Sequence, residues 1–282
     1  MTEPHEMADG PEEGAQPFVA PCRDLAINAP FGWIKKGARD MRIAPRQSLT
    51  YGAIIVGVSL LVTAVAIRFG GYWLLLMLVS GFIFVAPLLA VGTYAISQQI
   101  ERGDKPSLRR CFGEERRAFG NLMVFALMAM VVFLVWARAG SAIHVFFPID
   151  AEHDWRSYLR FFGIGSAVGS IFAAVVFSVA AFSLPMIMDR KVDTVTAVVT
   201  SVNAVLRNKF TMTVWAAMIS LAVAPGFALL FVGREQGAGA AWVMLGLGLT
   251  LPLIGHATWH AYRETIDASE WPLNVEATTE SG

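Results

Sequence analysis

Six long apolar stretches dominate the sequence and decide what it can fold into. Each is long enough for a helix to cross the hydrocarbon core of a bilayer, which takes about 20 residues. Only 16% of the 282 residues are charged, against about 25% in an average soluble domain. The sequence therefore predicts an all-α membrane protein with six transmembrane helices. The stretches cover residues 48–68, 71–99, 119–139, 161–188, 210–233 and 240–262.

The lysines and arginines are distributed unevenly between the segments that connect these stretches. Sixteen of them lie in residues 35–46, 102–117 and 190–209 and at Arg263, whereas the connections on the opposite side hold five. Cytoplasmic connections of membrane proteins carry such an excess of basic residues. We therefore expect a multi-pass protein with both termini in the cytoplasm.

The segments before the odd-numbered stretches are predicted to form amphipathic helices on the membrane surface. In residues 194–208 six apolar side chains share one helical face, and Thr194 can cap the helix start. These side chains are Val195, Val198, Val199, Val202, Val205 and Leu206.

Proline, glycine and asparagine positions recur between these segments, and Pro-Leu-Leu and Pro-Leu-Ile recur in the second and sixth stretches. We interpret the recurrence as a threefold parallel repeat of one surface helix and two spans. Chance matches between prolines and glycines are the alternative. The proposed units are residues 31–100, 107–190 and 194–263.

These units form one membrane domain over residues 29–268, between two acidic tails. The tails, residues 1–28 and 269–282, are polar and are predicted to be disordered. Cys22 and Cys111 fall on the cytoplasmic side, where thiols stay reduced, and are expected to remain unpaired.

Small residues four apart in the fourth stretch predict close packing between helices of the chain. They are Gly165 with Gly169 and Ser166 with Ser170. Prolines inside the stretches should kink their helices.

The residues best suited to bind a metal ion lie at the inner end of the sixth stretch. His256, His260 and Glu264 are spaced by four and share one helix face. Their donor atoms suit zinc or a similar divalent ion, and Asp189 or Glu101 could approach from the same depth. Alternatively, the histidines form hydrogen bonds to neighbouring helices or to headgroups. Haem is disfavoured, because two histidines on one helix face cannot ligate opposite sides of one haem.

Several motifs resemble a family of bacterial integral membrane proteins, domain of unknown function 2189. They are Pro30-Phe31-Gly32-Trp33-Ile34, Gln99-Ile100-Glu101-Arg102-Gly103 and Gly255-His256-Ala257-Thr258-Trp259-His260-Ala261-Tyr262-Arg263, and the resemblance spans residues 25–270. It implies a bacterial inner-membrane location and an association with respiratory complexes, and it implies no known activity.

Some members of that family carry the automatic label of cytochrome c oxidase subunit I. The catalytic subunit of such an oxidase needs histidine ligands on several helices. This chain has five histidines, of which two lie in a span. The label therefore does not fit this chain as the catalytic subunit.

The sequence thus predicts a non-enzymatic accessory or assembly factor, linked through the resemblance to respiratory oxidases. Its expected partners are the lipid bilayer and other membrane protein subunits. A transporter or channel for a small solute, favoured by the repeat and the kinked helices, is one alternative. A metal-handling protein that uses His256 and His260 is the other. The net charge of zero indicates no nucleic-acid partner.

Overall fold

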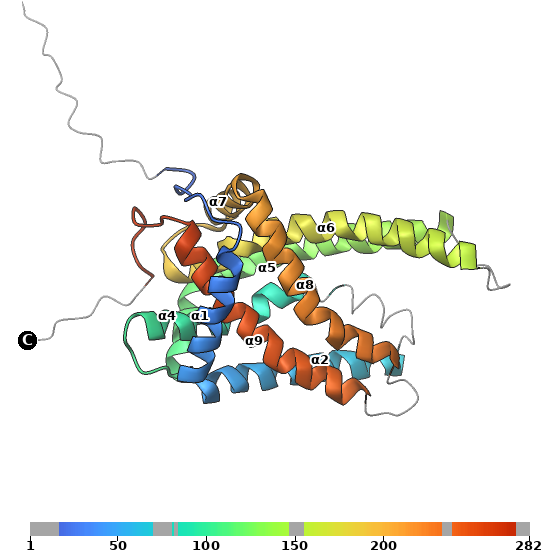
Figure 1. The fold of residues 1–282 in the computed structure, drawn as a ribbon, viewed down its shortest axis with the longest axis horizontal. Helices are drawn as coiled ribbons and strands as arrows, with labels where there is room; N and C mark the ends of the chain where they lie inside the picture. Colours follow the sequence, from blue (N-terminus) through green and yellow to red (C-terminus); the bar gives the residue numbers. More distant parts are fainter. Residues whose placement is uncertain (1–16, 70–80, 82–83, 147–154, 233–238, 275–282) are drawn as a thin grey trace, which may run out of the picture.

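The computed structural model describes residues 17–69, 81, 84–146, 155–232 and 239–274, and this part of the chain is helical without a regular sheet (Figure 1). The predicted all-α class is therefore confirmed. The helices with defined bounds are α1 (Ala29–Ile43), α2 (Pro45–Phe69), α4 (Val91–Glu101), α5 (Leu108–Phe146), α6 (Trp155–Asp189), α7 (Thr194–Arg207), α8 (Lys209–Val232) and α9 (Gly239–Thr265).

The long helices keep large apolar side chains on their outer surfaces. On α5, Leu127, Val131 and Leu134 are each more than half exposed. A soluble monomer rarely exposes contiguous apolar surface of this kind, whereas a bilayer solvates it. By length and composition, two helices in the described ranges are able to cross a membrane, Leu108–Ile143 and Leu159–Asp189. The count of six spans stays a prediction, and most of the expected stretch 71–99 before α4 lies outside the described residues.

The junctions between surface helix and span differ along the chain. α1 ends before Pro45, which has no amide hydrogen and restricts the residue before it. In the predicted repeat, Asn121 of the second unit occupies the position that Pro45 has in the first. Asparagine is compatible with a helix, and α5 continues through it. The separate surface helix expected over residues 107–118 is therefore the first part of α5. At the third junction α7 ends at Arg207, with Asn208 as its C-cap, close to the expected end at residue 208.

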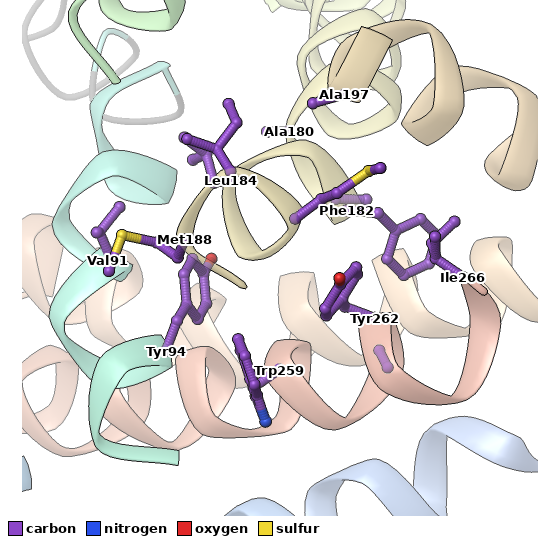
Figure 2. Close-up of a cluster of buried hydrophobic side chains, with 14 of the residues drawn as sticks. Val91, Tyr94, Ala180, Phe182, Leu184, Met188, Ala197, Trp259, Tyr262 and Ile266 are labelled. Atoms are coloured by element: carbon purple, nitrogen blue, oxygen red, sulfur yellow. The ribbon is translucent and has the colours of Figure 1, made fainter. Parts of the chain in front are cut away.

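Helix α9 lies at the centre of the fold and packs against α1, α2, α4, α6 and α8, while α5 and α6 form a long pair that extends away from the other helices (Figure 1). The buried core sits where α1, α4 and α7 meet the ends of α6 and α9. Figure 2 shows part of this core, with Tyr94, Phe182, Met188, Trp259 and Tyr262. The fold is thus tightly packed at the end that carries the basic connections.

The structure describes parts of both predicted tails, residues 17–28 and 269–274. Ala20 and Trp271 are buried there, whereas Phe18 and Ile27 are exposed. Disorder of the tails stays a prediction. Cys22 pairs with Ile266, just after α9, in an antiparallel bridge, and Leu273 pairs with Arg190 in another. The polar composition of the two tails gave no indication that Ala20 and Trp271 are buried. Both Cys22 and Cys111 are free thiols, as predicted.

Helix α7 packs against α6 mainly through small and hydroxyl side chains, including Thr200, Ser201 and Ala204. Val198 and Val205 of the apolar stripe are also buried, whereas Val195 and Leu206 are exposed. In a bilayer the apolar side chains can contact lipid, and small or hydroxyl side chains allow close helix contact. The cap is Asp193, which accepts from two backbone amides, so the expected cap at Thr194 is one residue too late.

Close helix approach occurs at other glycines than those of the fourth stretch. A Cβ atom on Gly165 would meet open space, and one on Gly169 would meet only the ring of Trp136. In contrast, a Cβ on Gly52 of α2 would collide with the backbone of Gly248 on α9. The predicted intramolecular packing through small residues exists, but it lies mainly at α9.

Candidate functional site

Three consecutive polar residues near the end of α4 organise the packed end of the protein. Ser97, Gln98 and Gln99 are all buried. Successive residues of an α-helix are rotated by about 100°, so three in a row point in three directions. Their side chains contact three different parts of the protein, and we call this arrangement the α4 hub.

The first branch of the α4 hub connects α1, α2 and α9 through Ser97. Its hydroxyl lies 2.8 Å from Asp40 Oδ2 and 2.8 Å from His256 Nδ1. His256 Nε2 lies 2.9 Å from the hydroxyl of Ser48, and His260 Nε2 lies 2.8 Å from Asp40 Oδ2. Five side chains therefore form one chain of hydrogen bonds, in which Asp40 and His256 are buried.

The number of protons in this branch is constrained by its geometry. Ser48 donates to the carbonyl of Ala44 at 2.9 Å, so His256 Nε2–H must then donate to Ser48. Ser97 has one hydroxyl proton for two neighbours, Asp40 and His256 Nδ1. All the bonds form together only when His256 or Asp40 holds an additional proton. Without that proton, the Ser48 hydroxyl must donate to His256 Nε2 and loses its hydrogen bond to the Ala44 carbonyl.

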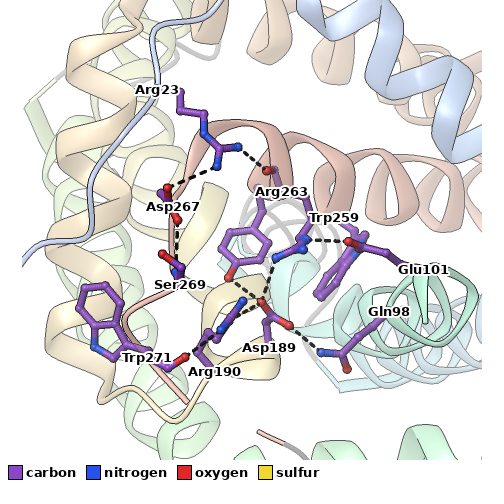
Figure 3. Close-up of polar contacts among 11 residues, drawn as sticks. Arg23, Gln98, Glu101, Asp189, Arg190, Trp259, Arg263, Asp267, Ser269 and Trp271 are labelled. Atoms are coloured by element: carbon purple, nitrogen blue, oxygen red, sulfur yellow. Dashed lines mark hydrogen bonds and ion pairs between the residues drawn. The ribbon is translucent and has the colours of Figure 1, made fainter. Parts of the chain in front are cut away.

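The second branch centres on Asp189 at the end of α6 (Figure 3). Its carboxylate accepts from Gln98 Nε2 at 3.0 Å and from the Tyr262 hydroxyl at 2.9 Å. Arg190 Nε lies 3.0 Å and an Arg263 nitrogen 3.5 Å from the same carboxylate. This branch joins the ends of α4, α6 and α9.

Arg263 extends the second branch to the end of α4. Its Nε donates to Glu101 at 2.9 Å, and Trp259 Nε1 donates to the other oxygen of that carboxylate at 2.8 Å. Glu101 and Asp189, the acidic residues that close two of the predicted units, therefore share one arginine from the third.

The third branch runs from Gln99 to the start of α5. Gln99 Nε2 donates to Glu114 at 3.0 Å, and its amide oxygen accepts from the backbone of Ser107 at 2.8 Å. Arg102 pairs with Glu114 at 3.7 Å. Burial raises the pKa of Glu114, and it raises the pKa of the nearby Cys111 thiol to about 12. Burial therefore disfavours the thiolate form of Cys111.

The predicted metal ligands each have a partner of their own in the structure. Both nitrogens of His256 contact serines, His260 contacts Asp40, and Glu264 pairs with Lys36 at 3.0 Å. Among the described residues no group of three or more His, Cys, Asp or Glu side chains is placed to hold a metal ion. The hydrogen bonds of the alternative interpretation are present, and the metal site stays a prediction.

A separate feature lies deeper between the long helices, where a cavity of about 740 Å³ opens between α6, α8 and α9. Its walls are almost entirely apolar and rich in alanine. Tyr94 and Trp215 contribute to its lining and belong to the packed core, and Thr258 lines it as well. We call this space the central cavity.

Sequence reasoning found His256 and His260 but missed Asp40 and the α4 hub. A usable signal was present, because Ser-Gln-Gln ends an apolar stretch and cannot turn all three side chains to water. Such a run predicts several buried hydrogen bonds. Which partners supply them depends on the tertiary structure.

The helical fold, with long apolar helices and buried polar contacts at one end, defines an integral membrane protein. Residues 74–189 match the model of a family described as "Predicted integral membrane protein (DUF2189)", the family that the motifs resemble; of these motifs, Gln99–Gly103 lies in the matched segment. The matched segment contains the α4 hub and Asp189. No curated protein and no solved structure matches the chain.

Proposed function

We propose that the chain is a non-enzymatic, six-span protein of the bacterial inner membrane that binds an apolar molecule inside the bilayer. The observation that carries the proposal is the central cavity. Its volume of about 740 Å³ lies within the range of roughly 300–1,000 Å³ that is typical of ligand pockets. A channel for a charged or strongly polar solute would need polar groups along its walls.

Three amide contacts support the threefold repeat within this proposal. The side chain of Gln47 donates to the carbonyl of Pro106 at 2.7 Å, and Asn121 donates to the carbonyl of Val192 at 2.8 Å. Asn208 donates to the carbonyl of Arg23 at 3.1 Å. In each case an amide near the start of an outward span holds the backbone before another unit. The three contacts run from unit one to two, two to three, and three to one.

The lining of the central cavity indicates the chemistry of its ligand. Alanine and serine positions on α6 and α8 widen the space, while Ile55, Phe177 and Ile254 give it an apolar wall. Burial of apolar surface contributes about 25 cal/mol per Å². A hydrocarbon chain or another bilayer-soluble molecule therefore fits this space, and it can enter from the lipid phase.

A tryptophan in the cavity wall should displace the ligand. Ala216 lines the cavity, and its neighbour Ala217 is exposed on the same helix and does not line it. We expect Ala216→Trp to reduce the apolar compounds that copurify with the protein several-fold, and Ala217→Trp to leave them unchanged. Solvent extraction of the purified protein and mass spectrometry measure this. Equal ligand content in wild type and both variants would reject the binding role.

The outer surface of α5 favours a second component of the function, an accessory role beside another membrane subunit. Only 11% of the apolar part of α5 is buried within the chain. The family resemblance suggests a respiratory oxidase as the partner. Purification in a mild detergent should recover that complex, and a solitary monomer would speak against this role.

Metal handling is the remaining proposal. It requires His256 and His260 to leave their serine and aspartate partners. Metal analysis of the wild type and of the variants His256→Ala and His260→Ala tests this proposal. If neither substitution changes the metal content, the proposal is wrong.

A further inference from the structure

A second hollow, outside the central cavity, lies between α2 and the start of α5. Its volume is about 520 Å³, and most of its lining is apolar. Ile54 of α2, Met123 of α5 and Leu88, which precedes α4, contribute aliphatic walls. Phe112 and Phe119 of α5 contribute aromatic ones. We call this hollow the α2–α5 groove.

Two adjacent residues of opposite charge, Glu115 and Arg116, line the α2–α5 groove. The hydroxyl of Tyr51 donates to Glu115 at 2.5 Å from across the groove. Arg116 is exposed. One acidic and one basic side chain thus line the same apolar space.

The surroundings of the Glu115 carboxylate favour the binding of a cation. Nearby arginines pair with other carboxylates, Arg102 with Glu114 and Arg110 with Asp104. Among the described residues, Glu115 has a neutral phenol as its hydrogen-bond donor and a second carboxylate, Glu114, beside it. Burial raises the pKa of Glu115, as expected for a carboxylate that has lost water without gaining a cation.

The position along the helices places this charged pair at the edge of the bilayer. Glu115 and Arg116 come one turn before the apolar stretch that begins at residue 119, and Tyr51 lies near the start of the stretch 48–68. Tyrosine and arginine are common at the depth of lipid headgroups. The apolar part of the α2–α5 groove then continues toward the hydrocarbon.

We propose that the α2–α5 groove binds a bilayer phospholipid with a primary ammonium headgroup, of the phosphatidylethanolamine type. Its ammonium donates to Glu115, its phosphate accepts from Arg116, and one acyl chain lies along Ile54, Leu88 and Met123. A headgroup with both charges fits the adjacent pair, whereas a purely anionic lipid would bring a second negative charge to Glu115. This inference rests on the membrane location and is independent of the ligand in the central cavity.

Native mass spectrometry of the full-length protein with added lipids tests the proposal. The probes are phosphatidylethanolamine, phosphatidylcholine, which lacks N–H donors, and phosphatidylglycerol, which lacks the ammonium. We expect the wild type to retain phosphatidylethanolamine best. Glu115→Gln should weaken that retention about tenfold, which corresponds to one lost charge-assisted hydrogen bond of about 1.4 kcal/mol. Asp24→Asn, at an exposed carboxylate on the segment before α1, should leave it unchanged.

A second variant separates loss of binding from loss of folding. Arg116 is exposed, so Arg116→Gln should retain the wild-type melting temperature while it weakens binding of all three phospholipids. Equal retention of phosphatidylethanolamine by the wild type and Glu115→Gln would overturn the proposal. Preferential binding of phosphatidylglycerol would also overturn it, because it would indicate attraction to the basic residues alone.

Discussion

Replacement of Asp189 by alanine is expected to lower the free energy of unfolding by about 3 kcal/mol. The carboxylate is 3% exposed and holds Gln98, Tyr262, Arg190 and Arg263. Its loss leaves buried donors and a largely buried arginine without their acceptor. We place the effect at the low end of the range for broken buried pairs, because the side chain of Arg263 is 37% exposed and keeps some of its water.

Unfolding by titration with a denaturing detergent measures this effect. Asp189→Asn keeps an acceptor oxygen and should lose less stability than Asp189→Ala. Asp24→Ala removes an exposed carboxylate from its pair with Arg207 and should leave the unfolding midpoint unchanged. An unfolding curve of Asp189→Ala that coincides with the wild type would show that the second branch of the α4 hub does not stabilise the fold.

Gly52→Ala should produce the other large loss of stability. The added methyl group would collide with the carbonyl oxygen of Gly248, which belongs to the backbone of α9 and cannot rotate away. The two helices must then separate, and overpacking of this kind costs about 1–3 kcal/mol. The same detergent titration applies, with a lower midpoint expected.

Gly57→Ala is the matched control for this prediction. Gly57 lies on the same helix, and a Cβ atom there would meet nothing within 4 Å. Alanine is the better helix former, so this variant should be as stable as the wild type. If both alanine variants lost stability equally, the close contact of α2 with α9 would not be the cause.

Much of the fold could be predicted from the length of apolar stretches. α2 covers the stretch 48–68, and α8 and α9 cover most of the last two stretches. The helix boundaries that differ do so for local reasons: Pro45 separates α1 from α2, whereas Asn121 lets α5 run on. Hydrophobic length identifies a helix, but its ends depend on single residues.

The contacts between helices were less predictable than the helices themselves. The valine stripe of residues 194–208 indicated an amphipathic helix but did not identify the helix it packs against, and the contact with α6 involves mainly Thr, Ser and Ala side chains. The spacing of Gly165 and Gly169 permits another helix to pack closely against this one, but it does not identify which helix. Among the described glycines, the closest approach of a built Cβ to another helix backbone is instead at Gly52, opposite Gly248.

The candidate site was predicted only in part for the same reason. The spacing of His256, His260 and Glu264 correctly places them on one helix, yet their partners come from distant parts of the chain. Asp40 lies 220 residues from His260 in the sequence. Helical periodicity gives no information on such contacts, whereas a buried run such as Ser97–Gln99 indicates that partners must exist.

The membrane orientation of α5 tests the account most directly. Single cysteines at Arg109 and Val145, both exposed and near opposite ends of α5, would be introduced after Cys22 and Cys111 have been replaced by alanine. A membrane-impermeant maleimide should label position 145 in intact cells and position 109 only after the membrane is opened. Labelling of both positions from the same side would show that α5 does not cross the bilayer. Labelling of position 109 alone in intact cells would show that the chain has the opposite orientation.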